Sequence, residues 1–126
     1  MNVAMFTNTY LPFIGGVPRS VETVVQEQQK RGNPCLIVAP KFKGAESSEG
    51  NVIRVNAIQN FNGSDFSVSF PDPVKISKAL DRFEPDIVHS HHPFLLGYSA
   101  VREASKREIP VVFTHHTLYE RYTHYV

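Results

Sequence analysis

Short apolar runs that alternate with helix-like segments constrain the fold of this chain more than any other feature. Strands are predicted at residues 2–7 (NVAMFT), 35–39 (CLIVA), 86–91 (DIVHSH) and 110–114 (PVVFT), where Val- and Ile-rich runs are typical of strands buried on both faces. Helical spacing of apolar residues predicts helices at 17–31, 73–83 and 93–107, the first ending at Gly32. This alternation predicts an α/β fold with a mostly parallel sheet and helices on both faces.

The remaining segments are less regular. Residues 41–50 are polar and rich in Gly and Ser, which predicts a surface loop. Residues 51–58 alternate between apolar and polar, as in a half-exposed or edge strand, and residues 59–73 form a long loop that contains Phe61, Phe66 and Phe70. Residues 117–126 resemble the beginning of a helix, so we expect the chain to be a piece of a longer protein.

Charge and cysteine content exclude several classes of protein. The 13 Lys and Arg against 12 Asp and Glu leave a net charge of +1, which does not indicate a nucleic-acid partner. The single cysteine, Cys35, rules out an intramolecular disulfide and favours a reducing, cytoplasmic compartment. The chain has neither a signal-peptide pattern nor an apolar run of the ~18 residues that span a bilayer.

The glycine pair Gly15 and Gly16 lies between the first predicted strand and the first helix. Adjacent glycines let backbone amides approach an anion, and the start of a helix offers unpaired N–H groups. The pattern is neither G-x-G-x-x-G nor a P-loop, because the spacing and the lysine are missing. A glycine pair that only makes a tight turn explains the sequence equally well.

All six histidines lie between His89 and His124, and most follow two strands: His89, His91 and His92 after one, His115 and His116 after the next. The carboxyl ends of parallel strands share one edge, so these histidines should gather near the glycine pair, with His89 and His91 on one face of the sheet. A zinc site is disfavoured, since there is no H-E-x-x-H motif, cysteine pair or suitably spaced carboxylate. We therefore predict no metal.

Tyrosines recur near the C-terminal end, at Tyr119, Tyr122 and Tyr125. On a helix they form one stripe, which packs in a core in most proteins but also suits the lining of an acceptor groove. Arg19 and Lys75 stand alone in the sequence and are interpreted as solvated.

Four segments occur in the order and spacing of glycosyltransferase family 4: FTNTYLPFIGGVPRSVE, GNPCLIVAP, PDIVHSHHPFLLG and PVVFTHHTLYERYTHYV. The chain resembles the amino-terminal half of these GT-B enzymes. Its ending, THHTLYERYTHYV, is most similar to the branch that glucosylates diacylglycerol in bacterial membranes, and more distantly to the phosphatidylinositol mannosyltransferases.

The resemblance implies that residues 1–126 form a single Rossmann-like, acceptor-side domain, and that a C-terminal nucleotide-sugar-binding domain is absent from this chain. Gly15 and Gly16 match the loop that approaches the donor diphosphate and sugar. His116 matches the histidine that contacts the donor sugar at the transfer site. His89 and His91 match the floor of the cleft, and Tyr119 and Tyr122 are placed on its acceptor side.

The resemblance also implies a retaining transferase that moves a hexose from a nucleotide-sugar, with UDP-glucose favoured, and uses no cofactor. The expected acceptor is a membrane lipid such as diacylglycerol, with peripheral contact at the inner face of the plasma membrane. Two alternatives remain open: a soluble glycan or sugar-phosphate acceptor, and a non-catalytic anion- or metal-binding module. The isolated chain is expected to be inactive.

Overall fold

A parallel sheet forms the centre of the fold in the computed structural model, which describes residues 1–8, 10, 16–41, 50–58, 68–69, 73–92 and 96–114. The sheet has five strands in the order β3-β2-β1-β6-β7, and every neighbouring pair is parallel. The strands are β1 (Val3–Phe6), β2 (Cys35–Pro40), β3 (Val52–Val55), β6 (Ile87–Ser90) and β7 (Val111–Phe113). Four of them lie within the predicted apolar runs at 2–7, 35–39, 86–91 and 110–114, to within one residue.

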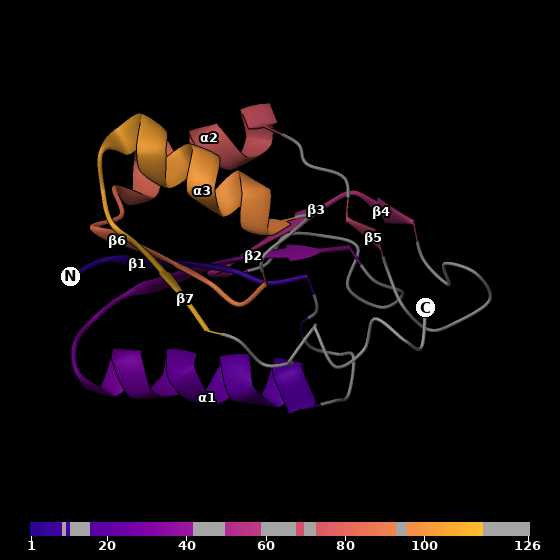
Figure 1. The fold of residues 1–126 in the computed structure, drawn as a ribbon. Helices are drawn as coiled ribbons and strands as arrows, with labels where there is room; N and C mark the ends of the chain where they lie inside the picture. The colour runs from indigo at the N-terminus through magenta and orange to yellow at the C-terminus, as the bar shows by residue number, and fades with distance from the viewer. Residues whose placement is uncertain are drawn as a thin grey trace.

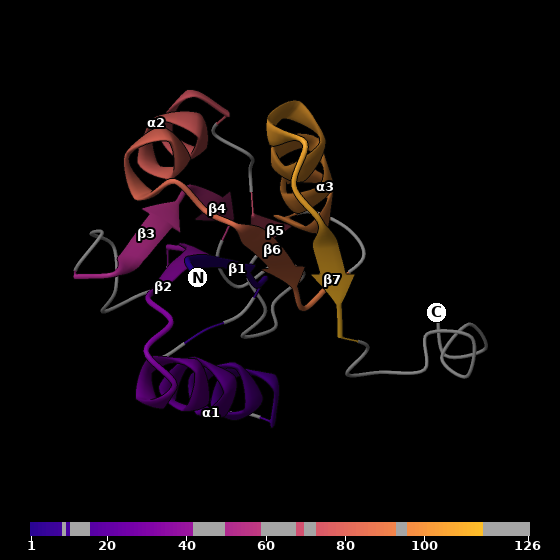
Figure 2. The same ribbon diagram turned by 90° about the vertical axis from the view of Figure 1, so that its left-hand side faces the viewer.

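Helices cover both faces of the sheet. Helix α1 (Gly16–Lys30) lies on one face, and α2 (Pro73–Phe83) and α3 (Leu96–Arg107) lie side by side on the other (Figures 1 and 2). Alternate residues of β1 serve the two cores: Ala4 and Phe6 pack with α2 and α3, whereas Val3 and Met5 pack with α1. The predicted α/β fold with a parallel, doubly covered sheet is therefore confirmed.

The end of α1 confirms the predicted stop at Gly32. This glycine has a φ of 81°, a backbone conformation that is strained for a residue with a side chain but not for glycine. Its N–H donates to Gln29 O at 3.0 Å, and Asn33 N–H donates to Gln28 O at 2.9 Å, so the last carbonyls of the helix are satisfied.

The segment 51–58 was predicted to be one strand, and this is wrong. β3 ends at Val55, and the chain continues into β4 (Ala57–Ile58), which pairs antiparallel with β5 (Val68–Ser69) in a separate two-stranded sheet. The partner strand lies inside the segment predicted to be a loop. Alternation of apolar and polar residues indicates extended backbone but does not identify the partner strand, which explains the error.

Candidate functional site

The order of the strands reverses at β1, since β2 and β3 follow on one side and β6 and β7 on the other. In open parallel sheets, ligands bind at the carboxyl ends of the strands beside such a reversal. The residues that follow the three strands there are polar: Thr7 and Asn8 after β1, His91 and His92 after β6, and Thr114 after β7.

His89 and His91 lie together on the face of the sheet that α1 covers. Ile87, two residues before His89, packs with the α1 core, and the two imidazole rings stack with centroids 4.2 Å apart and planes 25° apart. His91 is fully buried, and its N–H donates to Phe6 O at 2.9 Å. The Nε2 of the half-buried His89 lies 2.6 Å from Thr114 Oγ1. The predicted shared face is confirmed.

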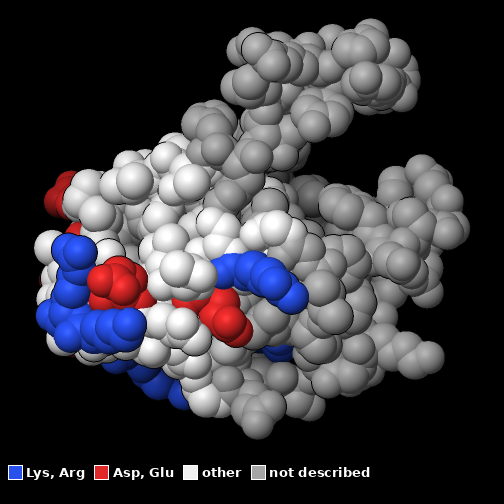
Figure 3. All heavy atoms as spheres, turned by 90° about the horizontal axis from the view of Figure 1, so that it is seen from below, with Lys and Arg blue, Asp and Glu red and all other residues white. Residues whose placement is uncertain are grey.

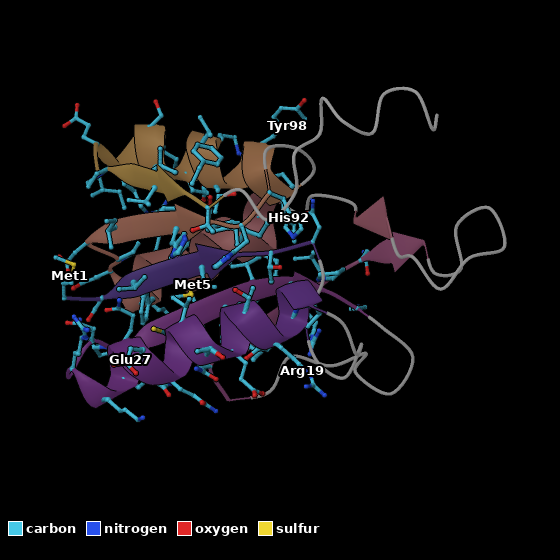
Figure 4. The ribbon with its side chains drawn as sticks, turned by 60° about the horizontal axis from the view of Figure 1, so that its bottom comes forward. Met1, Met5, Arg19, Glu27, His92 and Tyr98 are labelled. Atoms are coloured by element: carbon cyan, nitrogen blue, oxygen red, sulfur yellow. The ribbon has the colours of Figure 1, made fainter. Side chains whose placement is uncertain are left out.

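His92 joins the ends of β6 and β1, because its Nε2 lies 3.3 Å from Thr7 Oγ1. In Figure 4 it lies at the end of the sheet opposite Met1. Arg19, in the first turns of α1, lies toward the same end (Figure 4). His89, His91 and His92 and the start of α1 therefore lie toward one edge of the domain, as predicted, whereas His115 and His116 lie outside the described residues.

The start of α3 packs closely onto the same edge. The N–H of Leu96 donates to Asn8 Oδ1 at 3.0 Å, so a side chain that follows β1 caps a helix 88 residues away. A Cβ added to Gly97 would lie 2.1 Å from His92 O, a steric clash that only glycine avoids. Ser90 Oγ donates to the same carbonyl at 2.7 Å. These contacts fix the loop after β6 against α3.

Gly16 is exposed at the start of α1, and no atom of the described residues would lie within 4 Å of a Cβ added there. Crowding by the described part of the chain therefore does not explain a glycine at this position. The first N–H groups of a helix lack intrahelical partners and carry partial positive charge, which suits an anion. Pro18, which has no N–H, lies within this first turn, where no intrahelical hydrogen bond is lost.

Several predicted site residues lie outside the described residues: Gly15, His115, His116, Tyr119 and Tyr122, together with Phe61, Phe66 and Phe70. Their roles stay predictions. Among the predicted residues that are described, Gly16, His89 and His91 lie at or near the carboxyl edge of the sheet.

A second polar group at this edge was missed by sequence reasoning. Arg54 on β3 is buried, its Nη1 donates to Pro40 O at 3.1 Å, and its guanidinium carbon lies 5.7 Å from the centroid of the Tyr10 ring. Lys75 Nζ donates to Arg54 O, so the interpretation of Lys75 as solvated is wrong, whereas Arg19 is exposed as expected. Burial lowers the pKa of the Arg54 guanidinium and raises the pKa of the Tyr10 phenol.

Simple signals point to some of the missed residues. Thr7 and Thr114 end predicted strands and Asn8 directly follows one, at the edge where ligands bind. Gly97 interrupts a helical pattern, which often marks a close approach of another segment. Nothing in the sequence singles out Arg54, because one charged residue in an alternating strand is usually exposed.

Neither metal-ligating residues nor the charges on the face that α1 covers provide a further site in the described part of the chain. No group of three or more His, Cys, Asp or Glu among those residues is arranged to hold a metal ion. Burial raises the pKa of the Cys35 thiol, which disfavours the thiolate that metals bind. On the face that α1 covers, basic and acidic side chains lie next to one another in Figure 3 and form no patch of one sign.

The fold and the edge residues define an open, parallel α/β domain of the class that binds ligands beside its strand reversal. Comparison with known families identifies the protein family within that class. The sequence profile described as Glycosyltransferase Family 4 matches residues 14–126, and the chain belongs to this family. The resemblance inferred from its four segments is thereby confirmed.

Known relatives agree with the branch that the resemblance predicted. The chain is 31% identical over 127 aligned residues to alpha-monoglucosyldiacylglycerol synthase of Streptococcus pneumoniae, covering 100% of this chain and 29% of that protein. It is 28% identical to the protein of the same name from Acholeplasma laidlawii, covering 100% of this chain and 32% of that protein. It is also 28% identical to GDP-mannose-dependent alpha-mannosyltransferase of Corynebacterium glutamicum, covering 93% of this chain and 29% of that protein. The chain thus spans less than a third of the length of these relatives.

Proposed function

We propose that this chain is the acceptor-side domain of a retaining glycosyltransferase, which moves a hexose from a nucleotide-sugar to a hydroxyl group of a membrane lipid such as diacylglycerol. The observation that carries the proposal is the alignment of the whole chain with two alpha-monoglucosyldiacylglycerol synthases. By the same relationship, UDP-glucose is the donor that we favour. The nucleotide-sugar acts as substrate, and the proposed transfer needs neither a cofactor nor a bound metal.

The start of α1 is suited to the leaving group. When a nucleoside diphosphate departs, negative charge develops on its phosphate oxygens, and preorganised N–H groups stabilise that charge. No side chain at Gly16 blocks the helix start, and no described residue crowds it, so phosphate oxygens can approach the backbone from there. Gly15, by resemblance, belongs to the same loop.

The histidines supply the proposed sugar side of the site. We place His116 beside the anomeric carbon, where its imidazole hydrogen-bonds a sugar hydroxyl and orients the oxocarbenium-like transition state. His89 and His91 form the floor of the cleft. Stacking of their rings and the contact between His89 and Thr114 hold this floor in one arrangement.

His116→Ala in the full-length protein tests this placement. A contact with the reacting sugar matters most in the transition state, so kcat should fall by at least about tenfold while the Kd for the nucleotide-sugar changes less than threefold. Steady-state kinetics and calorimetric titration measure the two quantities. An unchanged kcat would remove His116 from the site.

A groove beside the sheet supports contact with a membrane. Its floor is apolar, three basic side chains of α2 flank it, and its volume is about 430 Å³; the lining residues are Leu36, Ile53, Lys75, Lys78, Ala79, Arg82 and Phe83. Basic groups beside apolar surface complement the headgroups and acyl chains of anionic lipids. In the described part of the chain no helix is long and apolar enough to cross a bilayer. We place the proposed contact at the inner face of the plasma membrane.

Co-sedimentation with phosphatidylglycerol or phosphatidylcholine vesicles tests the groove. Replacing both Lys78 and Arg82 by Glu should lower binding of the full-length protein to phosphatidylglycerol by at least about tenfold, since each basic residue near an anionic surface contributes ~1 kcal/mol. Lys30→Glu, on α1, is the control and should bind like the wild type. Equal binding by all three proteins would contradict a membrane contact here.

The mannosyltransferase relatives favour a second candidate, in which GDP-mannose is the donor. The acceptor in that case is a soluble glycan or sugar phosphate. Transfer to soluble acceptors without vesicles would support it over the lipid acceptor.

A further inference from the structure

We propose that Arg54 is a positioning residue for donor use, which acts through Tyr10 to set the first turns of α1 against the sheet. The inference rests on the proposed function, because it assumes that the start of α1 receives the donor phosphates. It concerns residues that neither the family resemblance nor the relatives single out.

Arg54 connects strands and loops that are separate in sequence. It lies on β3 with only 6% of its surface exposed, and its Nη1 donates to Pro40 O, where β2 ends, at 3.1 Å. Its backbone oxygen accepts a hydrogen bond from Lys75 of α2. Its guanidinium lies over the ring of Tyr10, 5.7 Å from the centroid, within the range of a cation–π interaction.

Tyr10 carries this connection to α1. It is 9% exposed and belongs to the same apolar cluster as Val21 and Val25 of the helix. Burial is the main reason that the pKa of the Tyr10 phenol is raised; the carboxylate of Glu22, also on α1, raises it further, whereas Arg54 lowers it, so both charges act on the ring. Tyr10 is therefore held between a guanidinium on the sheet and the first half of α1.

Burial of the Arg54 guanidinium costs free energy, because desolvation of a charge costs more than burial of an apolar side chain of similar size. Stability of the fold alone therefore does not explain an arginine at this position. An aliphatic side chain here would pack against Tyr10 but would not fix the plane of the ring or the distance to Pro40. What Arg54 adds is a defined position for Tyr10 and, through it, for the helix that begins at Gly16.

Small shifts of a binding group have large kinetic effects, because reacting groups must be held close to their productive geometry. Donor use should therefore depend on Arg54, which contacts Tyr10, Pro40 and Lys75. The KM for the acceptor should be less sensitive, because His89 and Thr114, at the ends of β6 and β7, pair with each other.

The first test compares Arg54→Lys and Arg54→Met in the full-length protein, below the unfolding temperature of both variants. Arg31→Met, an exposed arginine near the end of α1, is the matched control. We expect the KM for UDP-glucose to rise by about tenfold in Arg54→Met and by less in Arg54→Lys, which keeps the charge and part of the hydrogen bonding. The KM for the acceptor should change less than twofold. Unchanged donor KM in folded variants, or equal losses for donor and acceptor, would overturn the proposal.

Hydrogen exchange supplies a measurement that needs no activity. Amides of residues 20–24 should exchange at least about tenfold faster in Arg54→Met than in the wild type, while those of α3 stay unchanged. Equal protection of residues 20–24 in both proteins would overturn the positioning role. If the wild type uses no nucleotide-sugar at all, the proposed function fails, and the exchange experiment still decides whether Arg54 positions α1.

Discussion

At the scale of single residues, Asn8 and Gly97 determine how the loop after β6 and the start of α3 meet the end of β1. Asn8 accepts the N–H of Leu96, and Gly97 permits an approach to His92 O that any side chain would block. Neither residue belongs to the predicted chemistry. Both hold the histidine-bearing edge in one arrangement, which a site for sugar transfer requires.

Asn8→Ala should lower the free energy of unfolding by about 1–2 kcal/mol, because it leaves the first N–H of α3 buried without its acceptor. Asn8→Asp keeps an acceptor oxygen and should recover much of the loss. Asn56→Ala, at an exposed position, is the control and should lie within about 0.5 kcal/mol of the wild type. Urea unfolding measures all three, and equal effects of the two alanine variants would contradict the capping role.

Gly97→Ala and Gly16→Ala make the same chemical change at the starts of two helices. The added Cβ at Gly97 would lie 2.1 Å from His92 O, so this variant should be destabilised by about 2 kcal/mol or more, although alanine normally favours a helix. At Gly16 no atom of the described residues lies within 4 Å of an added Cβ, and stability should stay the same or rise. Thermal unfolding compares them. A less stable Gly16→Ala variant would show that the fold, rather than a ligand, requires that glycine.

At the scale of elements, α2 and α3 are joined by a network of charges. Arg107 on α3 contacts Asp81 of α2 and lies 3.2 Å from Glu103, whose side chain is 1% exposed. Ser77 Oγ of α2 donates to the same Glu103 carboxylate. A buried carboxylate stays in the core only with such partners, so the network fixes how the two helices cover their face of the sheet.

Arg107→Met should lower the free energy of unfolding by about 3–5 kcal/mol, because it leaves Glu103 buried without its cation. Arg102→Met changes an exposed arginine of the same helix and should cost less than about 0.5 kcal/mol. In the double variant with Glu103→Leu, much of the loss should be recovered. Losses that simply add in the double variant would contradict a coupled pair.

The elements also show how far the sequence predicts the structure. The positions of four strands and of the amphipathic helices were predicted correctly, because the apolar period reports local conformation. The expected burial of the strand at 110–114 was wrong, since Val112 and Phe113 are exposed on β7 at the edge of the sheet. Two features depend on residues that are distant in the chain: the pairing of Ala57–Ile58 with Val68–Ser69, and the burial of Arg54 against Tyr10. No local pattern encodes such contacts, so these features were mispredicted or missed.

At the scale of the whole molecule, the strand reversal at β1 explains why part of the site was predictable. Parallel strands deliver their carboxyl ends to one edge, so His89, His91 and Gly16 were predicted to gather there from strand order and spacing. Asn8 and Gly97 were missed because their roles depend on the docking of α3. The chain covers 29% and 32% of the two alpha-monoglucosyldiacylglycerol synthases to which it is similar, so the proposed recognition of donor and acceptor must be tested in the full-length protein.

The central claim is that the full-length protein transfers a hexose to a membrane lipid. The most direct measurement incubates it with radiolabelled UDP-glucose or GDP-mannose and vesicles that contain diacylglycerol, and follows label in the lipid extract. We expect a labelled glycolipid from UDP-glucose, with the anomeric configuration of the donor retained. Absence of labelled lipid under all conditions, or label only in soluble acceptors, would contradict it.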